Sequence, residues 1–161
     1  MKYKKLLLST VISLFIFTGN SFTAGISSED NVSKYEKLYK KGALLIKQGK
    51  KLEKKDKIKK AKKKYLRAIK YLEQSNQIEP GKPDTLNYLG FALRKIGNFE
   101  DAEKFYLEGL KIDPEHVGIN EYLGELYIST NRLDKAKERL KILETCNCEE
   151  YSELKNLINQ N

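Results

Sequence analysis

The sequence predicts an all-α fold, an α-solenoid of about three helical hairpins closed by a C-terminal capping helix. Three observations predict it. The chain aligns with itself at a period of 34 residues, each period holds two segments with apolar residues at helical spacing, and small residues recur at fixed offsets on the apolar side. The 161 residues leave room for one domain, and a hydrophobic content of 40% is enough for its core.

The internal repeat is visible as columns of like residues. Rows of 34 place the following residues above one another: Ala68, Ala102 and Ala136; Gly90 and Gly124; Tyr65, Phe99 and Leu133; Pro80, Pro114 and Cys148. Two short amphipathic helices cannot bury their apolar faces alone, so hairpins from neighbouring rows must stack. The sequence therefore predicts hairpins stacked in chain order.

Glycine and proline positions predict where the helices cross and where they end. Gly90 and Gly124 lie where paired helices cross, and the missing side chain lets the backbones approach, although glycine costs roughly 1 kcal/mol of helix propensity against alanine. Gly97 and Asn131 follow the first helix of a row, where a left-handed residue can end it. Pro114 ends a second helix, because proline lacks the amide that would continue it.

The first row is longer than the other two. Gly42 and Gly49 are seven residues apart, as are the matching glycines of the second row, but the second helix fits only if 14 residues are inserted near 50–63. Apolar residues continue through the insertion at the spacing of a helix–helix seam. We therefore expect both helices to be prolonged, with the bend near Lys55 and Asp56. The alternative is a disordered lysine-rich loop, which Gly49 favours.

The order of these residues resembles the tetratricopeptide repeat, whose period is also 34 residues. The pattern reads Leu86-x-x-Leu89-Gly90-x-x-Leu93, then Ala102-x-x-x-Tyr106, then Pro114. It departs at Leu86 and Asn120, where the family has a large aromatic residue, and at Cys148 in the proline column. The resemblance implies a TPR-like domain over 30–161, with repeats at about 35–82, 83–116 and 117–150 and a capping helix at 149–160.

In tetratricopeptide repeat proteins, the first helix of each repeat lines a concave groove that takes a peptide or another protein's helix. The resemblance therefore implies a scaffold or adaptor with a protein or peptide partner. The matching positions, row by row, are Tyr39, Ala43, Ile46 and Lys47; Asp84, Asn87, Phe91, Arg94 and Lys95; and Glu121, Glu125, Ile128 and Ser129. Phe91 and Ile128 are the expected apolar anchors, with Arg94, Lys95 and Lys47 as steering charges. The alternative is a groove so shallow that binding occurs at an edge.

Residues 1–24 have the pattern of a secretory signal peptide. Three lysines precede an apolar run from Leu6 to Phe17, and small and polar residues follow, with cleavage expected between 20 and 26. This run is too short to span a bilayer comfortably. We therefore expect export to the periplasm of a bacterium. The alternative is an uncleaved leader that tethers the chain to the inner membrane.

Lysine is concentrated in and beside the insertion, where 50–67 carry ten Lys and one Arg against Glu53 and Asp56. The basic residues are Lys50, Lys51, Lys54, Lys55, Lys57, Lys59, Lys60, Lys62, Lys63, Lys64 and Arg67. Such a patch can bind anionic lipid or cell-wall polymer, which makes a peripheral envelope-binding protein the second function hypothesis. Nucleic acid is not expected outside the cytoplasm, and no base-stacking aromatic residues accompany the lysines. The alternative is a solvated helix face.

The remaining residues give no sign of catalysis. Cys146 and Cys148 are the only cysteines, and an oxidising compartment favours a structural disulfide, with free thiols or a redox role as alternatives. His116 is the only histidine and falls in a predicted turn. The sequence holds no set of metal ligands and no phosphate-binding loop, so we expect no enzyme activity, cofactor or small-molecule substrate.

Overall fold

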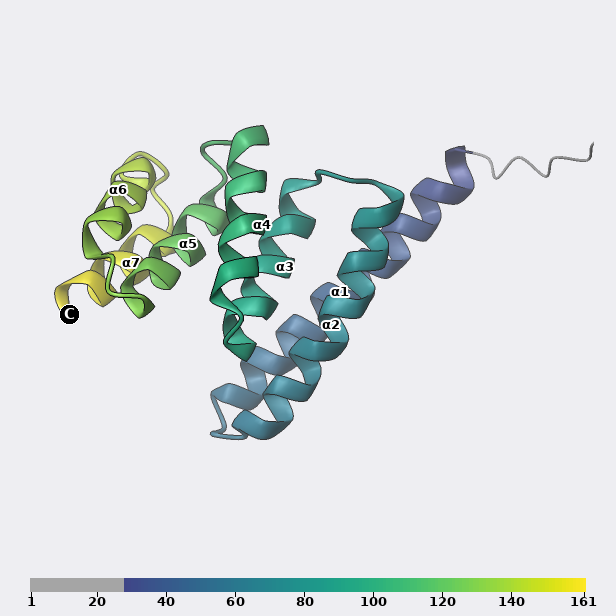
Figure 1. Ribbon diagram of the computed structural model, residues 1–161, viewed down its shortest axis with the longest axis horizontal. Coiled ribbons are helices and arrows are strands. Elements are labelled where there is room, and N and C mark those ends of the chain that lie inside the picture. The colour runs from purple at the N-terminus through teal and green to yellow at the C-terminus, as the bar shows by residue number, and fades with distance from the viewer. Residues whose placement is uncertain (1–27) are drawn as a thin grey trace, which may run out of the picture.

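The computed structural model describes residues 28–161, and the predicted signal peptide lies outside this range. Within the described range the chain forms seven α-helices and no strand (Figure 1). The helices are α1 Ser28–Glu53, α2 Ile58–Ile78, α3 Pro83–Ile96, α4 Phe99–Ile112, α5 Val117–Ser129, α6 Leu133–Leu143 and α7 Glu149–Asn159. The prediction of an all-α solenoid with a capping helix is confirmed.

Three hairpins follow one another along the solenoid (Figure 1). Helix α1 packs against α2, α3 against α4 and α5 against α6, while α7 packs on both α5 and α6. The first helices also contact their neighbours, α1 with α3, α3 with α5 and α5 with α7, whereas α2, α4 and α6 make no direct contact with one another. Since the first helices are the more closely spaced, they form the inner, concave side.

Glycines mark two places where paired helices approach closely. A Cβ added at Gly90 would lie 2.5 Å from a ring carbon of Tyr106, and one added at Gly42 would lie 2.5 Å from Leu72. Tyr106 and Leu72 are fully buried. The predicted use of glycine at hairpin crossings is therefore confirmed in the first two hairpins.

Gly124 serves a different contact from the one predicted. The three atoms nearest to a Cβ built there all belong to Leu154 on α7, and the nearest, a methyl carbon, is 2.6 Å away. The tightest contact at Gly124 is therefore with α7, whereas the sequence predicted the crossing of its own hairpin. The reason is that α7 packs directly on α5 and needs the same close approach.

The helix ends follow the predicted backbone chemistry. Gly97 ends α3 with φ 95°, and Asn131 follows α5 with φ 57°, both in the left-handed region. Asn98 begins α4 by accepting a hydrogen bond from the Asp101 amide through its side chain. These caps separate the two helices of each hairpin by a short turn.

The first hairpin is prolonged, as the sequence predicts. Helix α1 runs unbroken through Gly49 to Glu53, and α2 begins at Ile58 after a turn in which Asp56 has φ 55°. Gly49 is a packing position, because its Cα lies against the Tyr65 ring. The alternative of a lysine-rich loop is therefore wrong, and the predicted prolonged helices are confirmed. Figure 1 shows the joined ends of α1 and α2 extending past α3 and α4; residues 50–67 are called the hairpin tip below.

Cys146 and Cys148 lie in the segment between α6 and α7. Their Cα atoms are 5.2 Å apart and their sulfur atoms are adjacent. This separation is within the range that a disulfide spans. Pairing of the two cysteines stays a prediction.

None of the helices of residues 28–161 is both long enough and apolar enough to cross a bilayer.

The close approach at Gly90 predicts that substitution by alanine destabilises the protein more at this position than at Gly124. We expect Gly90→Ala to lower the free energy of unfolding by about 1–2 kcal/mol, because overpacking against the Tyr106 ring outweighs the gain in helix propensity. Gly124→Ala is the matched control and should cost less, since the methyl groups of Leu154 can rotate away. Urea unfolding followed by circular dichroism measures both. Equal stability of Gly90→Ala and wild type would contradict the packing argument.

Candidate functional site

A recess of about 260 Å³ lies on the concave side, where α1, α3, α5 and α7 meet. The residues that line this central recess are Lys50, Glu53, Lys54, Phe91, Arg94, Lys95, Glu121, Tyr122, Glu125 and Glu153. Every first helix and the capping helix contribute to it. It is therefore the point at which all of the concave helices converge.

Two aromatic rings, tilted against each other, lie beneath a cation in the central recess. The ring centroids of Phe91 and Tyr122 are 4.9 Å apart, and Tyr65 meets Phe91 edge-on at 5.7 Å. The Lys50 ammonium lies 4.8 Å from the Phe91 centroid and 4.9 Å from the Tyr122 centroid, and it donates a 2.6 Å hydrogen bond to the Tyr122 hydroxyl. Cation–π attraction and this hydrogen bond hold Lys50 over the concave face.

The other cations of the recess are held by carboxylates. Arg94 pairs with Glu125 at 2.7 Å, and Lys95 pairs with Glu53 at 2.9 Å. The Arg94 guanidinium is also 5.5 Å from the Phe91 centroid. These pairs join α3 to α5 and α3 to α1, so they position the concave helices relative to one another.

Glu121 is a buried carboxyl group with only 3% of its surface exposed. Burial raises its pKa to about 9, and a hydrogen bond to Glu153 and the negative charges of Glu125 and Glu153 act in the same direction, while Lys50 opposes them. At neutral pH the Glu121 carboxyl is therefore protonated. It shares its proton with Glu153 and so joins α5 to α7.

A line of half-buried tyrosines leads along the concave side to the central recess. Tyr39 stacks on Tyr35 with centroids 6.1 Å apart, and Tyr39 and Tyr88 are 5.8 Å apart. Burial raises the pKa of Tyr39 and of Tyr122, so both hydroxyls stay protonated. We call Tyr39, Tyr88 and Tyr122 the tyrosine row. It offers ring faces and hydroxyl groups from α1, α3 and α5.

The structure brings five of the sequence-predicted groove residues into the central recess: Phe91, Arg94, Lys95, Glu121 and Glu125. Two of them differ from their expected roles. Phe91 is only 3% exposed, so it forms the floor and does not project as an anchor. Arg94 is buried and ion-paired, so it is not a free steering charge. Packing of Tyr122 and Lys50 over Phe91 explains the first difference.

Three other predicted residues are occupied by structural contacts. The Ile46 side chain is 2% exposed and belongs to the core, so its predicted place in the groove is wrong. Asp84 accepts a 3.3 Å hydrogen bond from His116, whose other ring nitrogen accepts from the Ile119 amide and caps α5. Asn87 is also buried. Helix packing therefore uses side chains that the resemblance to the tetratricopeptide repeat assigned to the groove.

The remaining predicted residues lie outside the central recess. Ile128 is half-buried against the core, and the Ser129 hydroxyl donates to the Glu125 carbonyl. Lys47 is exposed on α1, and Ala43 is half-buried. Tyr39 belongs to the tyrosine row.

Sequence reasoning missed several residues of this face. Tyr88 and Tyr122 stand 34 residues apart, so the repeat alignment carried a signal for them. The repeat alignment gave no signal for Glu53 or Glu153, since neither falls in a repeat column with the residues it contacts. Lys50 was assigned to the basic patch alone, although it also lines the recess.

The described residues include no group of three or more His, Cys, Asp or Glu side chains that could hold a metal ion. The carboxyl groups of the recess are used in ion pairs and in the shared proton. The arrangement is suited to holding a ligand by ring faces, hydroxyl groups and charges.

Comparison with known proteins identifies the repeat. Residues 83–116, which hold α3 and α4, match the family model of the tetratricopeptide repeat. The hairpin of α3 and α4 is thus similar to a tetratricopeptide repeat. The matched segment supplies Tyr88, Phe91, Arg94 and Lys95 to the concave face. A search of curated protein sequences finds no significant match.

Solved structures of tetratricopeptide repeats share the fold at low sequence identity. The first TPR of Spaghetti (RPAP3), bound to the HSP90 peptide SRMEEVD, has a TM-score of 0.55 at 20% identity, covering 75% of this chain and 92% of that one. The second TPR of the same protein, with the same peptide, has a TM-score of 0.51 at 18% identity, covering 71% and 95%. The Yersinia enterocolitica type III secretion chaperone SycD, with a peptide of the translocator YopD, has a TM-score of 0.56 at 17% identity, covering 84% and 92%.

The protonated state of Glu121 predicts a pH-dependent stability. Its pKa rises from 4.5 to about 9 on folding, so the unfolded chain loses this proton first and stability falls as pH rises between these values. Glu121→Gln cannot ionise and should raise the free energy of unfolding at pH 8 by about 1–3 kcal/mol, with little effect at pH 4. Denaturant unfolding at both pH values checks this. Glu108→Gln, on the exposed face of α4, is the control and should keep the wild-type profile. If the free energies of unfolding of Glu121→Gln and wild type changed with pH in parallel, the protonated state of Glu121 would be refuted.

Proposed function

We propose that this protein is an exported scaffold or adaptor that binds a protein or peptide partner through its concave face. The observation that carries the proposal is the tyrosine row, which runs across α1, α3 and α5 and ends in the central recess. Half-buried aromatic rings beside charged groups are common where proteins bind other proteins. No other described surface joins all three hairpins in this way.

The solved structures support a peptide ligand. Three structures of similar fold hold short peptides, from HSP90 in two cases and from YopD in the third. Their identity to this chain is 20% or less, so the likeness concerns the fold and leaves the ligand of this chain to be found.

The recess indicates which chemistry a partner would use. Tyr88 and Tyr122 take the anchoring role expected of Phe91 and Ile128, because their rings remain partly accessible. The exposed Lys54 remains available at the rim, while the carboxylates of Glu53 and Glu125 are neutralised by ion pairs. A segment with an apolar side chain and an acidic group would match this surface. The proposal includes no catalytic step, cofactor, nucleic acid or small-molecule substrate.

Export rests on the leader pattern of residues 1–24, with the periplasm as the proposed destination. An oxidising compartment would favour a disulfide between the adjacent Cys146 and Cys148, next to the turn that introduces α7.

A second candidate function is contact with an anionic envelope surface. The observation that favours it is the hairpin tip, which carries ten Lys and one Arg. The turn that joins α1 to α2 at its end extends past α3 and α4 (Figure 1). Cationic side chains at an exposed tip attract anionic lipid or cell-wall polymer. This function could operate together with binding at the concave face.

Removing the tyrosine row should abolish partner capture. In crosslinked affinity capture from intact cells, Tyr88→Ala with Tyr122→Ala should reduce recovery of the protein partner at least tenfold, because both accessible rings are lost. Tyr71→Ala, on α2 away from the concave face, is the matched control and should capture the same protein. Circular dichroism confirms that each variant is helical. Undiminished capture by a folded double variant would exclude the concave face.

Export and cysteine pairing can be checked on one sample. Protein purified from the envelope fraction should have the mass of a chain from which about residues 1–24 have been removed. A disulfide should lower this mass by two further hydrogen atoms, and reduction should add these two hydrogen atoms back. Cys146→Ser should abolish the change on reduction. A full-length mass in the membrane fraction would favour the tethered form, and protein confined to the cytoplasm would refute export.

A further inference from the structure

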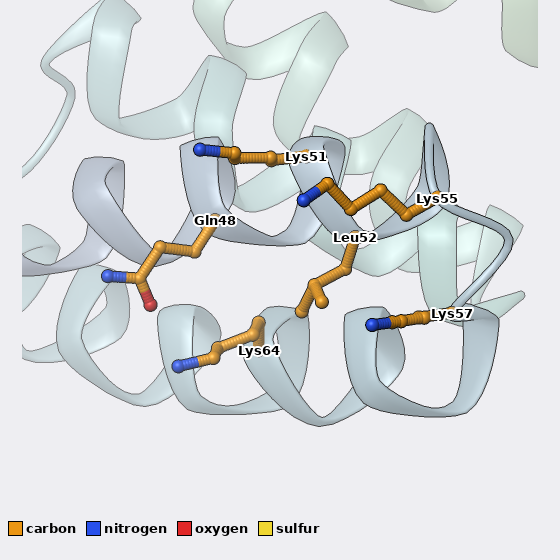
Figure 2. A pocket seen from close by; sticks show the side chains of 6 residues that line it. All are labelled: Gln48, Lys51, Leu52, Lys55, Lys57 and Lys64. Carbon is orange, nitrogen blue, oxygen red and sulfur yellow. The ribbon is translucent and has the colours of Figure 1, made fainter.

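A hollow rimmed by four amines lies between α1 and α2 at the hairpin tip (Figure 2). Its volume is about 290 Å³. The residues that line it are Gln48, Lys51, Leu52, Lys55, Lys57 and Lys64. Figure 2 shows the lysine side chains of both arms arranged around Leu52, which forms an apolar floor. Cations from two helices and their turn are thus gathered around one aliphatic side chain.

These four amines have no carboxylate partners. The ion pairs found among residues 28–161 involve none of them. Glu53, which is close to them in sequence, is paired with Lys95 on the concave side. The positive charge on this side of the tip is therefore free to meet an external anion.

A second hollow of about 310 Å³ continues the first along the same two helices. It shares Gln48 and Lys64 with the first hollow. The residues that it adds are Lys41, Leu44, Leu45, Arg67 and Tyr71. Leu44 is 55% exposed and lies beside the lysines of this hollow. We call the two hollows together the basic seam.

We propose that the basic seam binds the surface of an anionic lipid bilayer, with its amines on headgroup phosphates and Leu44 in the headgroup region. This inference rests on the second candidate function, and it names the ligand and the face of the hairpin that would meet it. Charge alone would suit any polyanion. The aliphatic floor and the exposed leucine favour a lipid surface, because a cationic helix face with apolar side chains binds at the boundary between headgroups and acyl chains.

The side chains of the basic seam combine apolar and cationic groups, as binding to a lipid surface requires. Lysine stems can cover apolar surface while their ammonium groups stay at the polar boundary. Ile58, 45% exposed beside Lys57, supplies a second apolar contact at the end of the hairpin. The seam is thus amphipathic along its length.

Co-sedimentation with vesicles tests the proposal. The full-length chain should bind vesicles of phosphatidylglycerol and phosphatidylcholine much more tightly than vesicles of phosphatidylcholine alone, and added salt should weaken this binding. The triple variant Lys51→Gln, Lys55→Gln and Lys64→Gln should reduce the charge-dependent partition on the order of 100-fold.

The matched control removes the same charge elsewhere. Lys62→Gln, Lys63→Gln and Lys70→Gln alter exposed lysines that line neither hollow, and together they should reduce the partition less than about tenfold. If both triple variants lose binding equally, the charge acts without a defined site and the inference fails, while the second candidate function survives. If wild type does not distinguish the two vesicles, the inference fails and the second candidate function is left with cell-wall polymer alone.

Leu44→Gln separates a lipid surface from a soluble polymer. It should weaken vesicle binding several-fold and leave binding of inorganic polyphosphate unchanged, because only the bilayer offers an apolar region. Unchanged vesicle binding by this variant would overturn the lipid assignment.

Discussion

Close contact between paired helices at glycine positions is the interaction on which the solenoid depends. Gly49 lies against the Tyr65 ring, and Gly90 against the Tyr106 ring. Both tyrosines are fully buried, so each ring fills the space that a larger residue on the facing helix would occupy. This spacing brings α1 and α3 into contact with their hairpin partners and sets the positions from which their outer side chains project. The concave face is a consequence of that packing.

Polar contacts then join one concave helix to the next. Lys95 and Glu53 join α3 to α1, Arg94 and Glu125 join α3 to α5, and the proton shared by Glu121 and Glu153 joins α5 to α7. A buried ion pair adds little net stability, since the cost of removing both charges from water offsets their attraction. Separating either partner is costly, however. We infer that these contacts select one alignment of the hairpins and so hold the tyrosine row in line.

The molecule separates two kinds of surface. On the concave side, the acidic groups are paired or protonated, and aromatic rings and hydroxyl groups predominate. Along the basic seam the amines are unpaired and surround aliphatic side chains. Lys50 and Lys51 are adjacent on α1 and belong to these different surfaces, because Lys50 lies over Phe91 and Lys51 lines the first hollow of the basic seam. One prolonged helix thus carries residues of both surfaces.

The sequence by itself determined the hairpins, their order and their ends, because glycine, proline and asparagine act through local backbone geometry and the period of 34 repeats them. It also determined the prolonged first hairpin, since apolar spacing continued through the insertion. Only the tertiary structure decided that Phe91 is covered, that Gly124 faces Leu154 and that Glu121 is protonated. Burial and pKa depend on distances between helices that are far apart in the chain, and no local pattern records those distances.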